Sequence, residues 1–173
     1  MIRVSGGAFR GRRLKVAPGV RPTTELARKA AFDILGPRVS GARVLDAAAG
    51  SGAYGIEALS RGASGAVFVE AAAPASRALA DNLRALEVGE RALVIRDSIA
   101  RFLRLAGERY DVVFYDPPWD APSDEDLEGL LDLTAAGGVL VHERGDPALP
   151  AIGRTPQDVR SYGRTRLLFY FCR

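Results

Sequence analysis

The sequence predicts an α/β protein whose doubly wound, mostly parallel sheet ends in an antiparallel hairpin. Between residues 42 and 143, short apolar runs alternate with stretches of helical period, the order of parallel strands joined by helical crossovers. Glycine-rich turns separate many of these segments. The last two apolar runs, Asp158–Tyr162 and Thr165–Phe171, are separated only by Gly163-Arg164, which is a hairpin signal.

Composition indicates one globular domain in the cytoplasm. The chain has 173 residues, of which 47% are hydrophobic, enough for one substantial core. No apolar run approaches the roughly 18 residues of a membrane span, and the first residues do not resemble a signal peptide. With one cysteine and one histidine, we expect neither an internal disulfide nor a metal site. We also expect a monomer.

The first 36 residues read as a small basic extension, and residues 37–173 as the main domain. Ile2–Ser5 and Arg13–Val16 are short alternating segments that predict a hairpin, and a helix of apolar period follows up to Gly36-Pro37. The net charge is +3, and basic residues gather in this extension. Such a block indicates a polyanionic partner such as nucleic acid, although a solvated arm would have the same composition. The candidate contacts are Arg10, Arg12, Arg13, Lys15, Arg21, Thr23 and Thr24.

The remaining elements follow from apolar runs and their punctuation. Predicted strands cover Arg43–Asp46, Gly65–Glu70, Ala92–Arg96, Tyr110–Tyr115 and Val139–Glu143. Predicted helices run from the loop after Gly52 to Leu59, from Pro74 to Leu86, from Ile99 to Leu105 and from Asp124 to Leu133. Gly137-Gly138 is expected to be the turn into the fifth strand of the sheet.

A glycine loop after the first strand of the sheet predicts a nucleoside-containing ligand. Gly50-Ser51-Gly52-Ala53-Tyr54-Gly55 is a complete G-x-G-x-x-G between a strand and a helix, where glycine lets the backbone approach a ligand. Glu70 follows 20 residues after Gly50, at the end of the next strand, where a carboxylate can bridge two ribose hydroxyls. A tight turn with a solvated Glu70 is the simpler alternative.

Further acids favour a cationic ligand over a dinucleotide. Asp46 precedes the glycines at the strand tip, where it would repel a pyrophosphate but suit an ammonium or a sulfonium. S-adenosylmethionine has both groups. Asp97-Ser98 follows the third strand and is placed either to bind an adenine amino group or to cap the next helix.

The turn Asp116-Pro117-Pro118-Trp119 ends the fourth strand of the sheet. Two prolines cannot continue a ladder, so the turn presents a carboxylate and carbonyl acceptors beside an indole. That combination suits a flat base carrying an amino group.

The chain resembles the class I methyltransferases of the RsmD type, bacterial enzymes that methylate guanine N2 in 16S ribosomal RNA. Motifs of the glycine loop, the following helix and the Asp-Pro-Pro turn carry this resemblance over nearly the whole chain. So do motifs near both ends: Ser5-Gly6-Gly7, Gly11-Arg12-Arg13-Leu14, Arg21-Pro22-Thr23-Thr24 and Tyr162-Gly163-Arg164-Thr165.

The resemblance implies a Rossmann-like fold, S-adenosylmethionine as donor, S-adenosylhomocysteine as product and 16S rRNA, free or within the 30S subunit, as partner. The donor would be held by Asp46, Ala48, Gly50, Ser51, Gly52, Glu70, Ala71, Asp97, Ser98 and Asp116. The substrate amine would lie at Asp116, Pro117, Pro118 and Trp119.

Two positions depart from the family pattern. Ala48 stands where the family usually has a bulky aromatic residue, which leaves donor affinity or substrate fit open. Trp119 replaces the usual Tyr or Phe and still offers a stacking face.

The predicted chemistry is attack of the amine on the donor methyl, with Asp116 and a turn carbonyl accepting the amine hydrogens. Trp119 would stack on the base. Alternatives are a dinucleotide-dependent oxidoreductase, an amino methyltransferase acting on DNA adenine or a protein amide, and a non-catalytic RNA-binding or assembly protein. Tyr162, Arg164, His142 and Glu143 are assigned either to the substrate side or to structure, with structure preferred for His142 and for the Tyr162–Arg164 pair.

Overall fold

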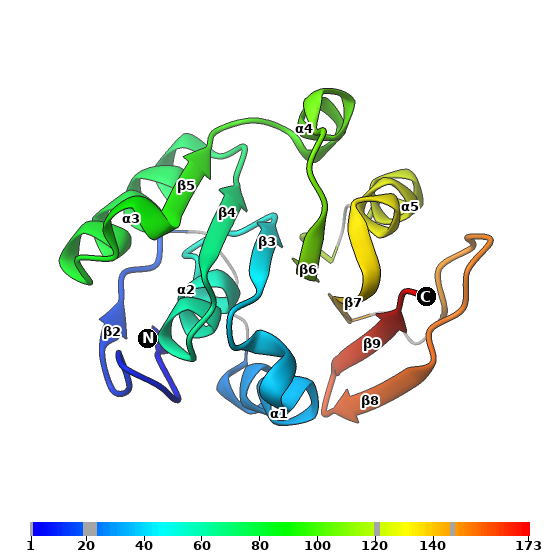
Figure 1. The fold of residues 1–173 in the computed structure, drawn as a ribbon, viewed down its shortest axis with the longest axis horizontal. Helices are drawn as coiled ribbons and strands as arrows, with labels where there is room; N and C mark the ends of the chain where they lie inside the picture. The colour runs from blue at the N-terminus through cyan, green and yellow to red at the C-terminus, as the bar shows by residue number, and fades with distance from the viewer. Residues whose placement is uncertain (1, 19–23, 120–121, 146–147) are drawn as a thin grey trace.

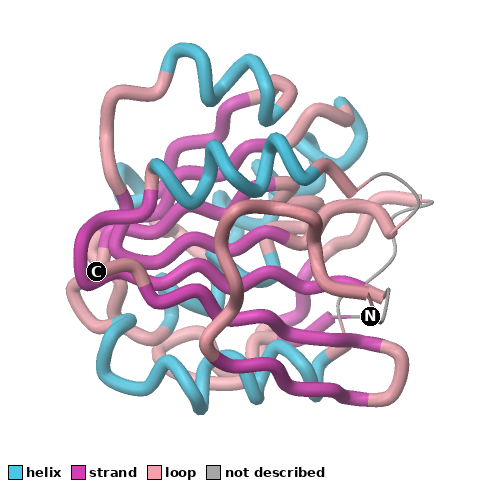
Figure 2. Tube along the Cα trace, turned by 90° about the vertical axis from the view of Figure 1, so that its right-hand side faces the viewer, coloured by secondary structure: helices cyan, strands magenta, loops and turns pink. Residues whose placement is uncertain are grey.

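Seven strands form one twisted sheet with helices on both of its faces (Figures 1 and 2). This computed structural model describes residues 2–18, 24–119, 122–145 and 148–173. The strands are β3 (Arg43–Ala47), β4 (Gly65–Val69), β5 (Ala92–Ile95), β6 (Tyr110–Tyr115), β7 (Thr134–Arg144), β8 (Asp158–Tyr162) and β9 (Thr165–Phe171). The helices are α1 (Glu25–Leu35), α2 (Ala53–Ser60), α3 (Ala73–Ala85), α4 (Ile99–Leu105) and α5 (Asp124–Asp132), with 3₁₀ turns at Gly36–Val39 and Gly89–Arg91.

The strand order is β5-β4-β3-β6-β7-β9-β8, with β3 to β7 parallel and β9 antiparallel to both neighbours. The predicted α/β class and its C-terminal hairpin are therefore confirmed. β4 and β5 follow β3 on one side of the sheet, whereas β7 follows β6 on the other side, so the strand order reverses between β3 and β6. A crevice at the carboxyl ends of these two strands is the usual ligand position in such a sheet.

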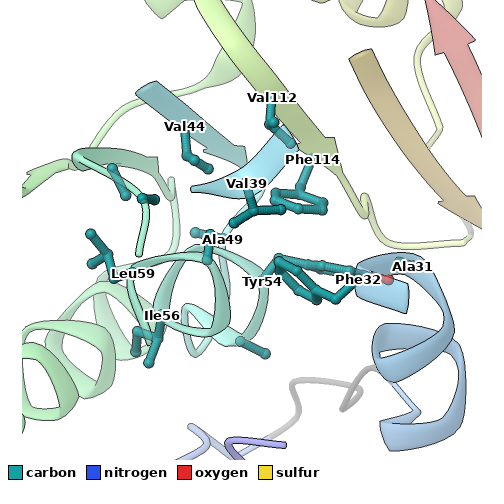
Figure 3. Packing of buried hydrophobic residues seen from close by; sticks show 14 of the residues in the cluster. Ala31, Phe32, Val39, Val44, Ala49, Tyr54, Ile56, Leu59, Val112 and Phe114 are labelled. Carbon is teal, nitrogen blue, oxygen red and sulfur yellow. The ribbon is translucent and has the colours of Figure 1, made fainter. Parts of the chain in front are cut away.

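Two hydrophobic clusters hold the layers together. One packs α1, α2 and α3 on one face, and the other packs α4 and α5 on the opposite face. In the first cluster, Tyr54 of α2 stacks on Phe114 of β6 with ring centroids 4.7 Å apart, and Phe32 of α1 lies 5.3 Å from Phe114 (Figure 3). Among the described residues no helix is long and apolar enough to cross a membrane.

The N-terminal hairpin is present as β1 (Ile2–Arg3) and β2 (Arg13–Leu14). Its apolar residues Ile2, Val4 and Leu14 are buried in the same cluster as α1 and α2. The extension of residues 1–36 thus shares the core of the sheet. Its separate role in ligand contact remains a prediction.

Gly137-Gly138 is not the turn that we predicted, because β7 already begins at Thr134. The pairing of β6 and β7 shifts register between Tyr110 and Val112, and Gly137 takes a φ of 78°. The backbone N–H of Gly137 donates to Cys172 O at 2.8 Å, and Cys172 N–H donates to Gly138 O at 2.9 Å. The glycines therefore form a bulge that joins the start of β7 to the end of the chain.

Candidate active site

A cavity of about 850 Å³ opens at the carboxyl ends of β3, β4, β5 and β6. It brings together nearly all the residues that the sequence assigned to donor and amine. Those that line it are Asp46, Ala48, Gly50, Ser51, Glu70, Ala71, Asp97, Ser98, Asp116, Pro117, Pro118 and Trp119. The volume suits a ligand of nucleoside size together with a second group.

Gly52 is the predicted donor residue that does not line this cavity. Its φ is 79°, and a Cβ built on it would lie 2.4 Å from Leu79 Cδ1. A Cβ on Gly55 would lie 2.3 Å from the Phe68 ring. These two glycines therefore let α2 pack closely on β4 and α3, while Gly50 and Ser51 face the cavity. The structure gives Gly52 a packing role, and its contact with the donor stays a prediction.

Asp46 is buried and already has a structural task. Its Oδ2 accepts the backbone N–H of Gly55 at 2.8 Å, which fixes the first turn of α2. Burial raises the pKa of Asp46 well above its usual value, and the Asp116 and Glu70 carboxylates raise it further, whereas the Gly55 N–H lowers it. A cation bound in the cavity would favour the ionised form.

Glu70 ties the glycine loop to the loop after β4. Its Oε2 accepts from Gly50 N at 2.8 Å, and its Oε1 accepts from Ala72 N at 2.7 Å. A carboxylate oxygen accepts more than one hydrogen bond, so both oxygens keep capacity for hydroxyls. Ala48, beside this loop, takes a φ of 60° and presents only a methyl to the cavity.

Asp97 and Ser98 lie at the start of α4 and also line the cavity. Ser98 caps α4, since its Oγ accepts from Arg101 N at 3.2 Å. Asp97 accepts from Ser98 N at 2.9 Å and lies 3.2 Å from Arg101 Nε. Both residues also line the cavity, so capping does not remove them from the ligand side.

Trp119 is wedged between two segments that follow it in the chain. A Cβ built on Gly145 would lie 2.2 Å from Trp119 Cε3, and the Arg164 guanidinium lies 5.9 Å from the indole centroid. Only glycine at position 145 leaves room for the larger indole that replaces the usual Tyr or Phe. The contact with Arg164 places the turn between β8 and β9 beside the active site.

We expect Gly145→Ala to push the indole out of place and lower kcat/KM for the substrate about tenfold, within the worth of one stacked base. Binding of S-adenosylhomocysteine should not change. Steady-state kinetics and calorimetry measure the two effects. Gly107→Ala is the control, because a Cβ there meets nothing within 4 Å. Trp119→Phe combined with Gly145→Ala should restore activity, and failure of both expectations would contradict the wedge.

A hydrogen bond joins Tyr54 to Glu143, and it could not be predicted from the sequence. Tyr54 is the fifth residue of the glycine motif, lines the cavity and donates its hydroxyl to Glu143 Oε2 at 2.7 Å. Both side chains are buried. Burial and the Glu143 carboxylate raise the pKa of Tyr54 well above its usual value, so its hydroxyl stays protonated. The contact depends on the tertiary packing of α2 against the end of β7.

His142 is buried away from the cavity, as we expected of a structural histidine. Its ring lies 4.9 Å from Tyr115. Neither ring nitrogen has a hydrogen-bond partner among the described residues, so the expectation of a satisfied histidine was wrong. Burial and the nearby Arg144 charge lower the pKa of His142 to about 3.

This pKa makes stability depend on pH. Between the usual value of 6.5 and the folded value of about 3, the unfolded chain binds a proton that the folded chain does not, so stability falls as the pH falls. We expect a loss of ~2 kcal/mol from pH 7.5 to pH 5 from this group. His142→Phe should remove that part of the slope and cost little at pH 7.5. Urea unfolding at several pH values measures the free energy of unfolding of both proteins. The same dependence on pH in His142→Phe and in the unaltered protein would contradict the prediction.

The basic residues of the N-terminal hairpin are exposed, but two of them already bind α3. Arg12 Nη2 donates to Ala85 O at 2.7 Å, and Lys15 Nζ lies 3.2 Å from Asp81 Oδ2. Arg10 and Arg13 are also exposed. Arg21 and Thr23 lie outside the described residues. Thr24 caps α1, since its Oγ1 accepts from Ala27 N at 3.3 Å.

Arg28 of α1 is buried although it is a basic residue. It is only 1% exposed and donates to Arg3 O. Its Nε lies 3.6 Å from Glu57 Oε2. Glu57 is fully buried and also accepts from Ser5 N and Ser5 Oγ, each at 2.7 Å. This cluster joins the hairpin to α1 and α2.

Comparisons with known proteins find relatives over most of the chain. The family described as "Conserved hypothetical protein 95" matches residues 2–171. Ribosomal RNA small subunit methyltransferase D of Escherichia coli K12 is 40% identical over 159 residues, which cover 87% of this chain and 80% of that protein. The putative rRNA methyltransferase YlbH of Bacillus subtilis is 39% identical over 137 residues, covering 76% and 73%.

A solved structure described as a putative methyltransferase, yhhF from Escherichia coli, superposes with a TM-score of 0.88 at 34% identity. The match covers 99% of this chain and 97% of that one. The family match and these relatives thus cover most of the chain. The chain belongs to the RsmD-type family of class I methyltransferases.

Proposed function

We propose that this protein transfers a methyl group from S-adenosylmethionine to the exocyclic N2 amine of a guanine in 16S ribosomal RNA. One observation carries the proposal: the donor-type loop and the acceptor-rich turn line the same cavity. The relatives described above, a ribosomal RNA small subunit methyltransferase and a putative rRNA methyltransferase, support an RNA substrate. We further propose that it acts as a cytoplasmic monomer, on free RNA or within the 30S subunit.

The residues of the cavity fit such a donor. Gly50 and Ser51 leave the loop backbone open to a close ligand, and Glu70 keeps acceptor capacity for ribose hydroxyls. Asp46, Glu70 and Asp116 give the cavity a concentration of acids that favours an ammonium and a sulfonium. When bound, the donor supplies an electrophilic methyl carbon.

The turn after β6 would prepare the nucleophile. An amino group conjugated to a base is weakly nucleophilic because its lone pair is delocalised into the ring. The two N–H groups of the amine would donate hydrogen bonds to Asp116 and to a carbonyl of the Pro117-Pro118 turn. These bonds favour a pyramidal nitrogen and stabilise the positive charge that develops on it. Trp119 would hold the ring of a flipped or unpaired base. Positioning contributes much of the acceleration.

Product analysis tests this function directly. Purified protein is incubated with methyl-labelled donor and either 16S rRNA or 30S particles, and the RNA is digested to nucleosides. We expect label in N2-methylguanosine. Label in N6-methyladenosine, or only in protein, would replace the substrate by another amino group, and binding of NAD with no methyl transfer would overturn the reaction.

The basic hairpin would position RNA through phosphate contacts. Deleting residues 1–20 would also remove the buried Ile2, Val4 and Leu14, so charge removal is the cleaner test. We expect Arg10→Gln with Arg13→Gln to reduce the slope of log affinity against log salt by about 1.5, since each phosphate contact contributes roughly 0.7–0.9. Affinity for S-adenosylhomocysteine should stay unchanged. An unchanged salt slope would remove these residues from the interface.

A further inference from the structure

Asn82 connects the basic hairpin segment to the glycine loop. It lies in α3 and is 4% exposed. Its Oδ1 accepts from Lys15 N at 2.8 Å, and its Nδ2 donates to Lys15 O at 3.0 Å. The same Nδ2 donates to Ser51 O at 3.0 Å. One buried amide therefore binds the chain just after β2 and a residue that lines the cavity.

These contacts use both amide hydrogens. An Asn amide has two N–H donors, and here one serves the segment after β2 and the other serves the glycine loop. All three partner atoms belong to the backbone, so displacement of either segment would leave a buried polar group unsatisfied, which is costly. The positions of Lys15 and Ser51 are therefore linked through one side chain.

Asn82 joins the two segments to which the proposed function assigns RNA and donor. Lys15 belongs to the basic segment together with Arg12 and Arg13, which the proposed function assigns to RNA phosphates. Ser51 is the middle residue of the loop that the same proposal assigns to the donor. The hairpin makes a further contact with α3, because Arg12 donates to Ala85 O. Helix α3 therefore contacts both the hairpin and the glycine loop.

We propose that Asn82 is a positioning residue that couples RNA binding at the basic hairpin to donor binding at the glycine loop. RNA bound to the hairpin holds the Lys15 backbone in place, and Asn82 then holds Ser51 O in its donor-competent position. This inference rests on the proposed function. Coupling is reciprocal, so donor must tighten RNA binding by the same factor as RNA tightens donor binding.

The test is a thermodynamic cycle with S-adenosylhomocysteine and a 16S rRNA transcript. Affinity for S-adenosylhomocysteine is measured by calorimetry with and without saturating RNA. In the unaltered protein we expect RNA to tighten binding by about fivefold or more, the lower end of ordinary coupling. In Asn82→Ala the ratio should fall to about one. Asn82→Asp keeps the acceptor for Lys15 N but turns a carboxylate oxygen toward two carbonyls, and should also lose the coupling.

Asp81→Asn is the matched control. Asp81 precedes Asn82 in α3 and contacts the Lys15 ammonium, with side chains exposed at 41% and 70%. Its removal changes RNA affinity through charge but leaves the link to Ser51 in place, so the coupling ratio should remain that of the unaltered protein. A general loss of stability in Asn82→Ala would weaken the affinity for S-adenosylhomocysteine both with and without RNA, and the ratio of the two affinities would persist. Thermal unfolding of each variant measures the loss of stability.

The possible results distinguish a failure of this inference from a failure of the proposed function. Absence of RNA binding in the unaltered protein overturns both. RNA and donor binding with a ratio near one in the unaltered protein overturns the inference alone. An unchanged ratio in Asn82→Ala and Asn82→Asp likewise shows that the coupling does not pass through Asn82.

Discussion

Replacement of Asp116 by Ala should lower kcat for methyl transfer by about 100- to 1000-fold, the usual cost of losing one preorganised electrostatic partner of a transition state. The reason is local. The side chain lines the cavity, and the Pro117-Pro118 turn offers only neutral carbonyl acceptors, which do not replace the charge of a carboxylate. S-adenosylhomocysteine lacks the sulfonium charge that a carboxylate attracts, so its affinity should change only slightly. Single-turnover kinetics and calorimetry separate the two quantities.

Two further variants sharpen that result. Asp116→Asn keeps one acceptor oxygen and should retain more activity than Asp116→Ala. Asp126 also lines the cavity, from α5, and Asp126→Asn removes an acid there without touching the turn. It should leave kcat nearly unchanged. Equal turnover in Asp116→Ala and the unaltered protein would remove the turn from the chemistry.

Elements whose signal is local could be predicted from the sequence. The final hairpin follows from Gly163-Arg164 between two alternating runs, and its strands β8 and β9 have the predicted bounds. The start of β7 could not be found in this way. Its bulge depends on backbone bonds to Cys172, a residue more than thirty positions away in a sequence that marks the glycines only as a turn.

The same distinction between local and long-range signals applies to the site residues. Motif spacing placed Glu70 and Asp116 on the cavity, because the carboxyl ends of parallel strands meet at one edge. Spacing did not distinguish Gly52, whose missing side chain serves the packing of α2. Nor did it predict Asn82 or the burial of Arg28, since both depend on partners from distant elements. Residues that join two segments leave no periodic pattern in either one.

Glu57→Ala should destabilise the protein by about 3–5 kcal/mol, the cost of leaving a buried charge without its partner. Arg28 is 1% exposed, and its Nε faces the Glu57 carboxylate at 3.6 Å. Without Glu57, the guanidinium keeps only its bond to Arg3 O among the contacts described above. Ser5 also loses both of its hydrogen bonds to the carboxylate. Thermal unfolding should shift down by roughly 10 °C.

Arg61→Ala is the matched control because Arg61 binds the same carboxylate at 2.8 Å but is 24% exposed. Water can replace part of that contact, so the loss should stay near 1 kcal/mol or below. Arg28→Met combined with Glu57→Leu removes both buried charges together and should recover much of the stability lost in Glu57→Ala. Equal destabilisation by Glu57→Ala and Arg61→Ala would show that the buried guanidinium does not depend on Glu57. Because Ser5 lies between the two strands of the basic hairpin, Glu57→Ala should also weaken RNA binding if the hairpin makes the proposed phosphate contacts.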